Sequence, residues 1–274
     1  MNILSIQSDV VFGHVGNAAA RFALSRLGHE VWAVPTVLLS SHAGYRTVTG
    51  DTMSADLLGR LVGGLHANGW LAGCDAVLSG YLGHADHAGV VADAVRRVKA
   101  GNPRALYCLD PVFGDGGRAY ARPGVAEGMA RTLMPLADII TPNGFELSSL
   151  ASVPVREPAD AVVAARRLGR PVVLATSVPA GEGRIGTLMV TADEAWLATT
   201  ALLEHPPHGP GDLMAALFLG HRLVGATLQD ALALATGSVF SILAAGGSEM
   251  ALVARQDVLL SRAASDVVRI ERLD

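Results

Sequence analysis

Short apolar runs alternate with segments of helical periodicity through residues 2–175, and this alternation limits the fold more than any other feature of the chain. The apolar runs are four to six residues long, which suits buried strands better than helices. We predict strands at residues 2–7, 30–35, 76–79, 105–109, 138–141 and 172–175, and helices at residues 17–27, 54–68, 88–100, 124–133 and 159–168. Strands and helices that alternate in this way form a parallel sheet with helical crossovers, so the sequence predicts an α/β fold.

The pattern changes after residue 180. Residues 187–190 and 194–199 flank Thr191-Ala192-Asp193 and predict a hairpin that extends the sheet with antiparallel pairing. Beyond Asp212 the chain is expected to be mostly helical. No internal repeat, low-complexity tract or long linker occurs, so we expect a doubly wound sheet in a single domain spanning residues 1–274.

Composition limits the kind of partner that the protein can have. Half of its residues are hydrophobic, yet no apolar run approaches the roughly 20 residues of a membrane-spanning helix. The formal charge is −4 and no basic run occurs, which argues against a nucleic-acid partner. The start of the chain has no basic segment before its apolar stretch, and Cys74 and Cys108 form no paired motif. These features favour a cytoplasmic protein that binds small molecules and neither membrane nor nucleic acid.

Lysine is nearly absent: of the 21 lysine and arginine residues, only Lys99 is a lysine. It follows two arginines near the expected end of a helix, a solvated position. A Walker loop, a protein kinase and a pyridoxal-phosphate enzyme each need a lysine at a defined place, and none is available here. If the chain handles phosphates, it must use helix N-termini, arginine and a divalent cation.

The sequence Gly209-Pro210-Gly211-Asp212 leads directly into the apolar stretch 213–224. A glycine turn that opens a buried helix directs backbone N–H groups and the helix dipole at one place, where an anion is favoured. Asp212 could accept a proton there while the amides hold a phosphoryl group. Asp is also a common helix cap, and on this segment alone the capping role is the more frequent one.

Polar residues follow most of the predicted strands. Because ligands of doubly wound sheets bind beyond the carboxyl ends of the strands, these residues are candidates for one site. They are Gln7-Ser8-Asp9 with Gly13 to Asn17, Ser79-Gly80-Tyr81, Asp110 to Asp115, Thr141 to Glu146, and Thr176-Ser177. Each could serve as an ordinary turn residue, but their joint occurrence favours a binding site.

Taken in order, these segments resemble the pyridoxal kinases of the ribokinase superfamily over nearly the whole chain. The resemblance rests on Ile6 to Asn17, Thr36 to Tyr45, Leu78 to Leu82, Asp110 to Tyr120, Thr141 to Glu146 and Gly209 to Asp212. It implies a ribokinase-like three-layer αβα sandwich with a mostly parallel central sheet and antiparallel edge strands. It also implies a flap at about residues 36–50 and a homodimer.

The resemblance implies that Asp212 takes the proton from the 5′-hydroxymethyl group of pyridoxal, with Gly209 and Gly211 at the transferring phosphate. The implied substrate-binding residues are Ser8, Val15, Gly16, Asn17, His42, Ala43, Gly44, Tyr81 and Asp212. The implied ATP-binding residues are Asp110, Asp115, Thr141, Asn143, Glu146, Thr176, Ser177, Gly209 and Gly211, with Asp110 and Glu146 holding Mg²⁺ largely through water. ATP and Mg²⁺ are the implied cofactors, and a monovalent cation is a further candidate.

Elementary chemistry supports these roles. Phosphoryl transfer passes through a loose transition state, so a weakly basic carboxylate is sufficient, and we expect the helix N-terminus to lower the pKa of Asp212. Glu146 could instead be a simple helix cap. Three residues depart from the pattern of relatives: Pro210 where many have Thr, Ser41 where Asn is common, and Thr176 where some bacterial members have Lys.

The expected activity is ATP-dependent phosphorylation of pyridoxal, and of pyridoxine or pyridoxamine, in vitamin B6 salvage. Two alternatives stay open. One is a hydroxymethylpyrimidine or other small-alcohol kinase with the same fold. The other is a weakly catalytic pyridoxal-binding protein.

Overall fold

Ten strands form one sheet in the computed structural model, which describes residues 1–273. In chain order they are β1 (Asn2–Val10), β2 (Glu30–Leu39), β3 (Gly50–Thr52), β4 (Ala76–Ser79), β5 (Leu106–Leu109), β8 (Ile139–Ile140), β9 (Val172–Pro179), β10 (Arg184–Val190), β11 (Ala195–Ala201) and β12 (Arg269–Arg272). Their order across the sheet is β12-β11-β10-β9-β8-β5-β4-β1-β2-β3. The strands from β9 to β2 are parallel, whereas β10, β11, β12 and β3 pair antiparallel at the two edges.

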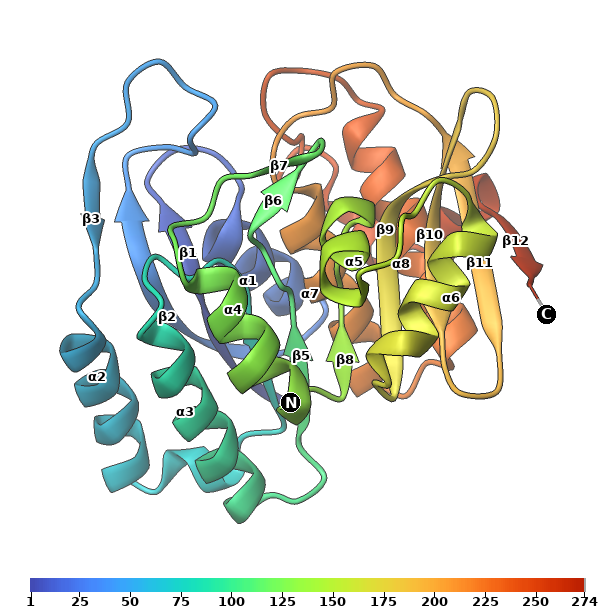
Figure 1. Cartoon of the computed structure of the whole chain (residues 1–274). Helices are drawn as coiled ribbons and strands as arrows, with labels where there is room; N and C mark the ends of the chain where they lie inside the picture. The colour runs from blue at the N-terminus through green and yellow to red at the C-terminus, as the bar shows by residue number, and fades with distance from the viewer. Residues whose placement is uncertain (274) are drawn as a thin grey trace.

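Helices cover both faces of the sheet (Figure 1). One face carries α2 (Ala55–Ala67), α3 (His87–Gly101), α4 (Val125–Gly128), α5 (Gly144–Ala151) and α6 (Pro158–Leu168), and the other carries α1 (Gly16–Arg26), α7 (Pro210–Leu223) and α8 (Leu228–Leu243). A small hairpin, β6 (Gly114–Asp115) and β7 (Arg118–Ala119), stands above the sheet in Figure 1. Short helical turns occur at Trp70–Gly73, Met129–Leu133, Met134–Leu136, Gln256–Leu260 and Arg262–Val267. The result is a three-layer αβα sandwich.

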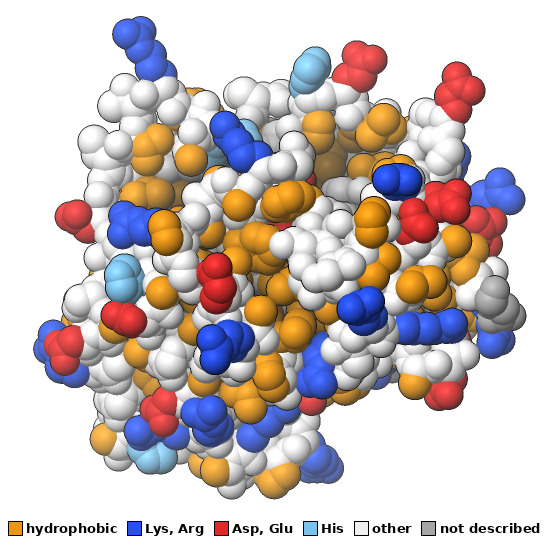
Figure 2. All heavy atoms as spheres, in the orientation of Figure 1, with side chains coloured by type: hydrophobic (Ala, Val, Ile, Leu, Met, Phe, Trp, Pro, Cys, Tyr) orange, Lys and Arg blue, Asp and Glu red, His pale blue; other side chains and the backbone are white. Residues whose placement is uncertain are grey.

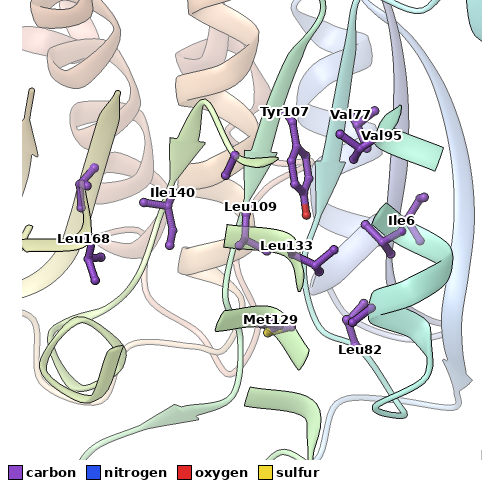
Figure 3. Packing of buried hydrophobic residues seen from close by; sticks show 14 of the residues in the cluster. Ile6, Val77, Leu82, Val95, Tyr107, Leu109, Met129, Leu133, Ile140 and Leu168 are labelled. Carbon is purple, nitrogen blue, oxygen red and sulfur yellow. The ribbon is translucent and has the colours of Figure 1, made fainter. Parts of the chain in front are cut away.

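The central parallel strands β1, β4, β5 and β8 are buried on both faces. In β1, Leu4 and Ile6 pack in the core beneath α2–α6, whereas Ile3 packs in the core beneath α1 and α7. Figure 3 shows the first of these cores, in which Ile6, Tyr107 and Met129 come from different elements. Strands with two buried faces appear in a sequence as nearly continuous apolar runs, which is why the strands were predictable.

Several helices begin at residues that satisfy their free backbone N–H groups. Ser54 accepts a hydrogen bond from Leu57 N (3.1 Å) at the start of α2, and Thr227 accepts one from Asp230 N (3.0 Å) at the start of α8. Asn143 and Glu146 form a reciprocal capping box at α5. These caps fix where each helix begins relative to the strand before it.

The six predicted parallel strands and the hairpin after residue 180 are confirmed. The helix expected at residues 124–133 is wrong in detail, because only α4 is α-helical and a π turn follows at Met129–Leu133. Pro135 has no N–H for an α-helical hydrogen bond, and it lies in a short 3₁₀ turn at Met134–Leu136 instead of extending the helix. The sequence analysis did not predict β3, β6, β7, β12 or α5.

Charged side chains of both signs are interspersed over the face shown in Figure 2, with hydrophobic side chains visible between them. None of the helices in residues 1–273 has the length and apolar character needed to cross a membrane.

Two buried histidines make the fold sensitive to acid. His29 Nε2 lies 3.1 Å from the carbonyl of Gly220, and the neighbouring His221 is also buried, with no hydrogen-bond partner at its Nε2 among the described residues. Burial lowers the pKa of both side chains, and the charge of His29 lowers the pKa of His221 further. Their neutral forms therefore stabilise the fold above the unfolded pKa of about 6.5, and this stability is lost as the pH falls through the lower folded pKa values.

We expect the melting temperature to fall by about 2–5 °C between pH 7 and pH 5, and the fall to be smaller in His221→Gln. Differential scanning fluorimetry across this range measures it. His66→Gln changes an exposed histidine and is the matched control. An identical pH dependence in His221→Gln and the wild type would contradict the explanation.

Candidate active site

The N-termini of α1 and α7 meet above the sheet. Gly209 is the N-cap of α7 and has φ of 95°, a conformation that favours glycine. A Cβ at Gly209 would lie 2.2 Å from the carbonyl oxygen of His14, in the loop that precedes α1. The close approach of these two loops therefore requires glycine and brings two helix N-termini together.

Ser8 lies beside the start of α1. The pairing of β1 with β2 is irregular between Gln7 and Asp9, so the ladder is interrupted next to Ser8. Gly16 has φ of 53°, and a Cβ there would lie 2.3 Å from Ser8 Oγ. The predicted substrate residues Ser8 and Gly16 are thus in direct contact.

Asp212 occupies the third position of α7, and its side chain is half-buried. No side-chain hydrogen bond caps α7, so Asp212 does not act as its helix cap, and its carboxylate faces the N-terminus of α1 at Gly16 instead. Burial raises its pKa to about 6, and the backbone N–H of Gly16 partly opposes this effect. The expected lowering of the pKa is therefore wrong, because desolvation outweighs the helix N-terminus.

Asp110 follows β5 and is 4% exposed. Its Oδ1 accepts a hydrogen bond from Thr141 Oγ1 (2.8 Å), whereas its Oδ2 is buried without a partner among the described residues. Burial, followed by the charges of Asp212 and Glu146, raises its pKa well above the usual range. The carboxylates of Asp212 and Glu146 thus lie close enough to Asp110 for their charges to act on it.

Glu146 is buried and binds the loop that carries β6. Its Oε1 accepts from Phe113 N (2.9 Å) and Gly114 N (3.2 Å), and its Oε2 accepts from Asn143 N (3.0 Å). The side chain of Asn143 also donates to Gly114 O (2.7 Å). Burial raises the pKa of Glu146 to about 7 despite these three amides. In this structure Glu146 and Asn143 hold the loop in place, in addition to capping α5.

The donor set at Asp110 suits a magnesium ion. Mg²⁺ prefers oxygen ligands and usually keeps several waters, so one or two carboxylates are sufficient. The unpartnered Oδ2 of Asp110 is the atom available for such a cation, while the hydrogen-bonded oxygens of Glu146 suit contact through water. No group of three or more His, Cys, Asp or Glu that could hold a metal ion by itself occurs in the described part of the chain.

Tyr120 follows the hairpin β6–β7, and the sequence analysis assigned it no role. The hairpin β6–β7 turns through Gly116 and Gly117, both with positive φ, and returns the chain so that Tyr120 N donates to Phe113 O (2.9 Å). Tyr120 is 51% exposed, so its phenol is only partly buried, and this burial and then the charges of Glu146, Asp212, Asp110 and Asp115 raise its pKa. The Asp-Gly-Gly sequence was the signal for this hairpin. Asp115 itself is exposed and accepts from Gly116 N (2.7 Å).

A pocket lies on the other side of the α7 N-terminus. Thr176 and Ser177, at the end of the parallel part of β9, line it together with Pro210 and Gly211. Its remaining walls are mainly apolar and come from β10, β11, α7, α8 and the loop before α7. Thr236 contributes a buried hydroxyl that has no partner among residues 1–273. An apolar pocket with a few hydroxyl groups suits a flat heterocycle.

The remaining predicted substrate residues surround the α1 N-terminus in different ways. Val15 is the N-cap of α1. The side-chain amide of Asn17 is buried and bonds to Ser5 Oγ (2.8 Å) and the carbonyl of Gln7 (3.1 Å), so only its backbone is left for a ligand. Tyr81 is half-buried after β4, and its carbonyl accepts from Thr36 Oγ1 (2.7 Å).

The predicted flap, residues 36–50, consists of the end of β2, a loop and the first residue of β3. Its residues Ala43 and Gly44 are exposed, whereas the ring of His42 is engaged with Glu249, in the loop after α8. Sequence reasoning missed Glu249, because nothing in the local sequence relates it to residues two hundred positions away.

Comparison with known proteins identifies the family. The family model for phosphomethylpyrimidine kinase matches residues 71–250. The pyridoxal kinase PdxY of Rubrobacter xylanophilus is 47% identical over 273 residues, covering 95% of this chain and 94% of that protein. That of Deinococcus radiodurans is 44% identical over 272 residues, covering 93% and 91%.

Solved structures agree with this result. Pyridoxal kinase from Leishmania donovani in complex with ADP and pyridoxamine has a TM-score of 0.93 at 29% identity, and the match covers 100% of this chain and 99% of that one. The ribokinase-like fold expected from the sequence is confirmed. The chain belongs to the pyridoxal kinase family.

Proposed function

We propose that this protein transfers the γ-phosphoryl group of ATP to the 5′-hydroxymethyl group of pyridoxal and so forms pyridoxal 5′-phosphate. The observation that carries the proposal is Asp212, a half-buried carboxylate that does not cap its own helix and lies at the junction of two helix N-termini. The relatives that are 40–47% identical over most of the chain are pyridoxal kinases, which supports the same substrate.

Each part of the site has a role in the transfer. Pyridoxal lies on the side of Ser8 and Gly16, and the nucleotide lies on the side of Thr176 and Ser177, so Asp212 stands between the two substrates. Asp212 accepts the proton of the attacking hydroxyl, and with a pKa of about 6 it is ionised at neutral pH. Ser8 can donate to or accept from the pyridine ring in either protonation state.

The transferring phosphoryl group is held by backbone amides of the α7 N-terminus. Pro210 has no N–H, so the amides of Gly209, Gly211 and Asp212 are the donors in our proposal. Removing one donor of this kind can cost about 3 kcal/mol of transition-state stabilisation where the donor is used. The half-exposed phenol of Tyr120, whose pKa responds to the carboxylates of the site, is a further donor toward the phosphates in our proposal.

We propose Mg²⁺ as the divalent cofactor, held by Asp110 and, through water, by Glu146. When bound, it neutralises the charge of the phosphates and of the clustered carboxylates. We also propose a homodimer in the cytoplasm, with a monovalent cation as a further candidate cofactor. These proposals follow from the family resemblance.

One observation favours a second substrate, because the matching family model describes phosphomethylpyrimidine kinase. A steady-state assay of ADP formation with pyridoxal, pyridoxine, pyridoxamine and hydroxymethylpyrimidine separates the candidates. We expect kcat/KM for pyridoxal to exceed that for hydroxymethylpyrimidine by at least about tenfold. A preference for the pyrimidine would support the second substrate, and ATP consumption that does not depend on pyridoxal would support a binding protein.

A further inference from the structure

Glu249 connects the flap to the loop before α1. It lies in the loop after α8, and its Oε1 accepts hydrogen bonds from His42 Nε2 (2.9 Å) and Tyr45 Oη (2.7 Å). Both donors belong to the flap, residues 36–50. The other oxygen faces the loop before α1, because a Cβ at Gly13 would lie 2.6 Å from Oε2. One carboxylate therefore touches two segments that are distant in the sequence.

The hydrogen bonds show which atoms of this cluster donate and which accept. His42 Nδ1 accepts from Gly44 N (3.1 Å), which assigns the proton of a neutral ring to Nε2, the atom that faces Glu249. Burial raises the pKa of Glu249, but the hydrogen bonds from Tyr45 and His42 outweigh it, and the pKa is lowered overall. Glu249 is an ionised acceptor of the hydrogen bonds from His42 and Tyr45, and its charge makes those bonds stronger than bonds between neutral groups.

Neighbouring contacts extend this cluster to the site. The rings of His42 and His208 lie 4.4 Å apart between centroids, and His208 immediately precedes Gly209. Met250 packs against Gly209, since a Cβ there would lie 2.9 Å from Met250 Cε. The segment Glu249-Met250 thus contacts the flap, the loop before α1 and the turn that begins α7.

We propose that Glu249 is a positioning residue for the phosphorylation reaction, holding the flap against the Ser8 and Gly16 side of the site, where pyridoxal binds. This inference rests on the proposed function. Because the pocket at Thr176 and Ser177 lies on the other side of the α7 N-terminus, Glu249 affects the binding of pyridoxal much more than the binding of ATP.

The test is Glu249→Gln, which keeps the shape of the side chain and removes its charge. We expect KM for pyridoxal to rise about tenfold, with KM for ATP changed less than about twofold. The matched control is Glu194→Gln, because Glu194 also accepts a side-chain hydrogen bond, from Trp196 Nε1 (2.9 Å), on the β10–β11 hairpin. Equal rises in both KM values, or no rise in either, would overturn the proposal.

Tyr45→Phe tests whether the hydrogen bond itself carries the effect. It should raise KM for pyridoxal in the wild type and have a smaller effect in the Glu249→Gln background, because its acceptor is already weakened there. Fully independent effects of the two substitutions would count against the proposal.

Hydrogen–deuterium exchange of the substrate-free protein gives a readout that does not depend on activity. We expect faster exchange at residues 40–49 in Glu249→Gln than in the wild type or Glu194→Gln. Unchanged exchange would overturn the anchoring role even if the wild type is an active pyridoxal kinase. If the wild type does not phosphorylate pyridoxal, the proposed function fails, and exchange still decides whether Glu249 holds the flap.

Discussion

Asp212→Asn should lower kcat for pyridoxal phosphorylation by about 10²–10⁴-fold while leaving KM for pyridoxal within about threefold. Asparagine is nearly the same size as aspartate but cannot accept the proton of the attacking hydroxyl. The pKa of about 6 also predicts that kcat/KM of the wild type declines below pH 6, as Asp212 becomes protonated. Coupled assays of ADP formation from pH 5 to 8 measure both effects.

The same substitution should slightly raise the melting temperature at pH 8. The folded pKa of Asp212, about 6, lies above the value of about 3.9 that aspartate has in an unfolded chain, so the ionised carboxylate destabilises the fold above pH 6 and has no such cost below pH 4. If Asp212→Asn has lower activity and unchanged or higher stability, the carboxylate of Asp212 serves catalysis and not the stability of the fold.

Asp230→Asn is the matched control for Asp212→Asn. Asp230 occupies the third position of α8, the same position that Asp212 has in α7, but it is exposed and accepts a hydrogen bond from Thr227 Oγ1 (2.8 Å). Its replacement should leave kcat unchanged. More than about a tenth of the wild-type kcat in Asp212→Asn would contradict the role of Asp212 as the base.

The sequence predicts the centre of the sheet well because its strands are buried on both faces. The edge strands are different. Neither Gly50–Thr52 nor Arg269–Arg272 forms an apolar run, and each becomes a strand only because β2 or β11 offers free backbone groups beside it. The short helix α5 was missed although its capping box was present in the sequence, because its apolar periodicity extends over only eight residues.

The sequence predicts which residues lie near the strand ends but not how their side chains are oriented. The rule for strand ends predicts that Ser8, Asp110, Thr141 and Glu146 lie at one edge, and the structure places Asp110, Thr141 and Glu146 close together there. Only the folded structure shows that Thr141 donates to Asp110 Oδ1 and that Glu146 accepts from backbone amides. It also shows that Asp110 Oδ2 has no hydrogen-bond partner among the described residues. The raised pKa of Asp212 was also unpredictable, because desolvation depends on neighbours that come from other parts of the chain.

Gly209→Ala should destabilise the protein by about 2–4 kcal/mol and remove most of its activity. Two effects add. The φ of 95° is strained for any residue with a Cβ, and that Cβ would lie 2.2 Å from the carbonyl oxygen of His14, so one of the two loops must move. Either movement separates the α1 and α7 N-termini and displaces Asp212 from Gly16.

Gly181→Ala separates the two effects. Gly181 has φ of 93°, almost the same as Gly209, but nothing lies within 4 Å of a Cβ built there. In this variant only the backbone strain should lower the free energy of unfolding, by about 1–2 kcal/mol, and kcat should equal that of the wild type. Thermal unfolding and steady-state kinetics of both variants give the comparison. If the two variants lose the same stability and both keep their activity, the contact between Gly209 and His14 does not position Asp212, and the geometry of the phosphate site must be set by other contacts.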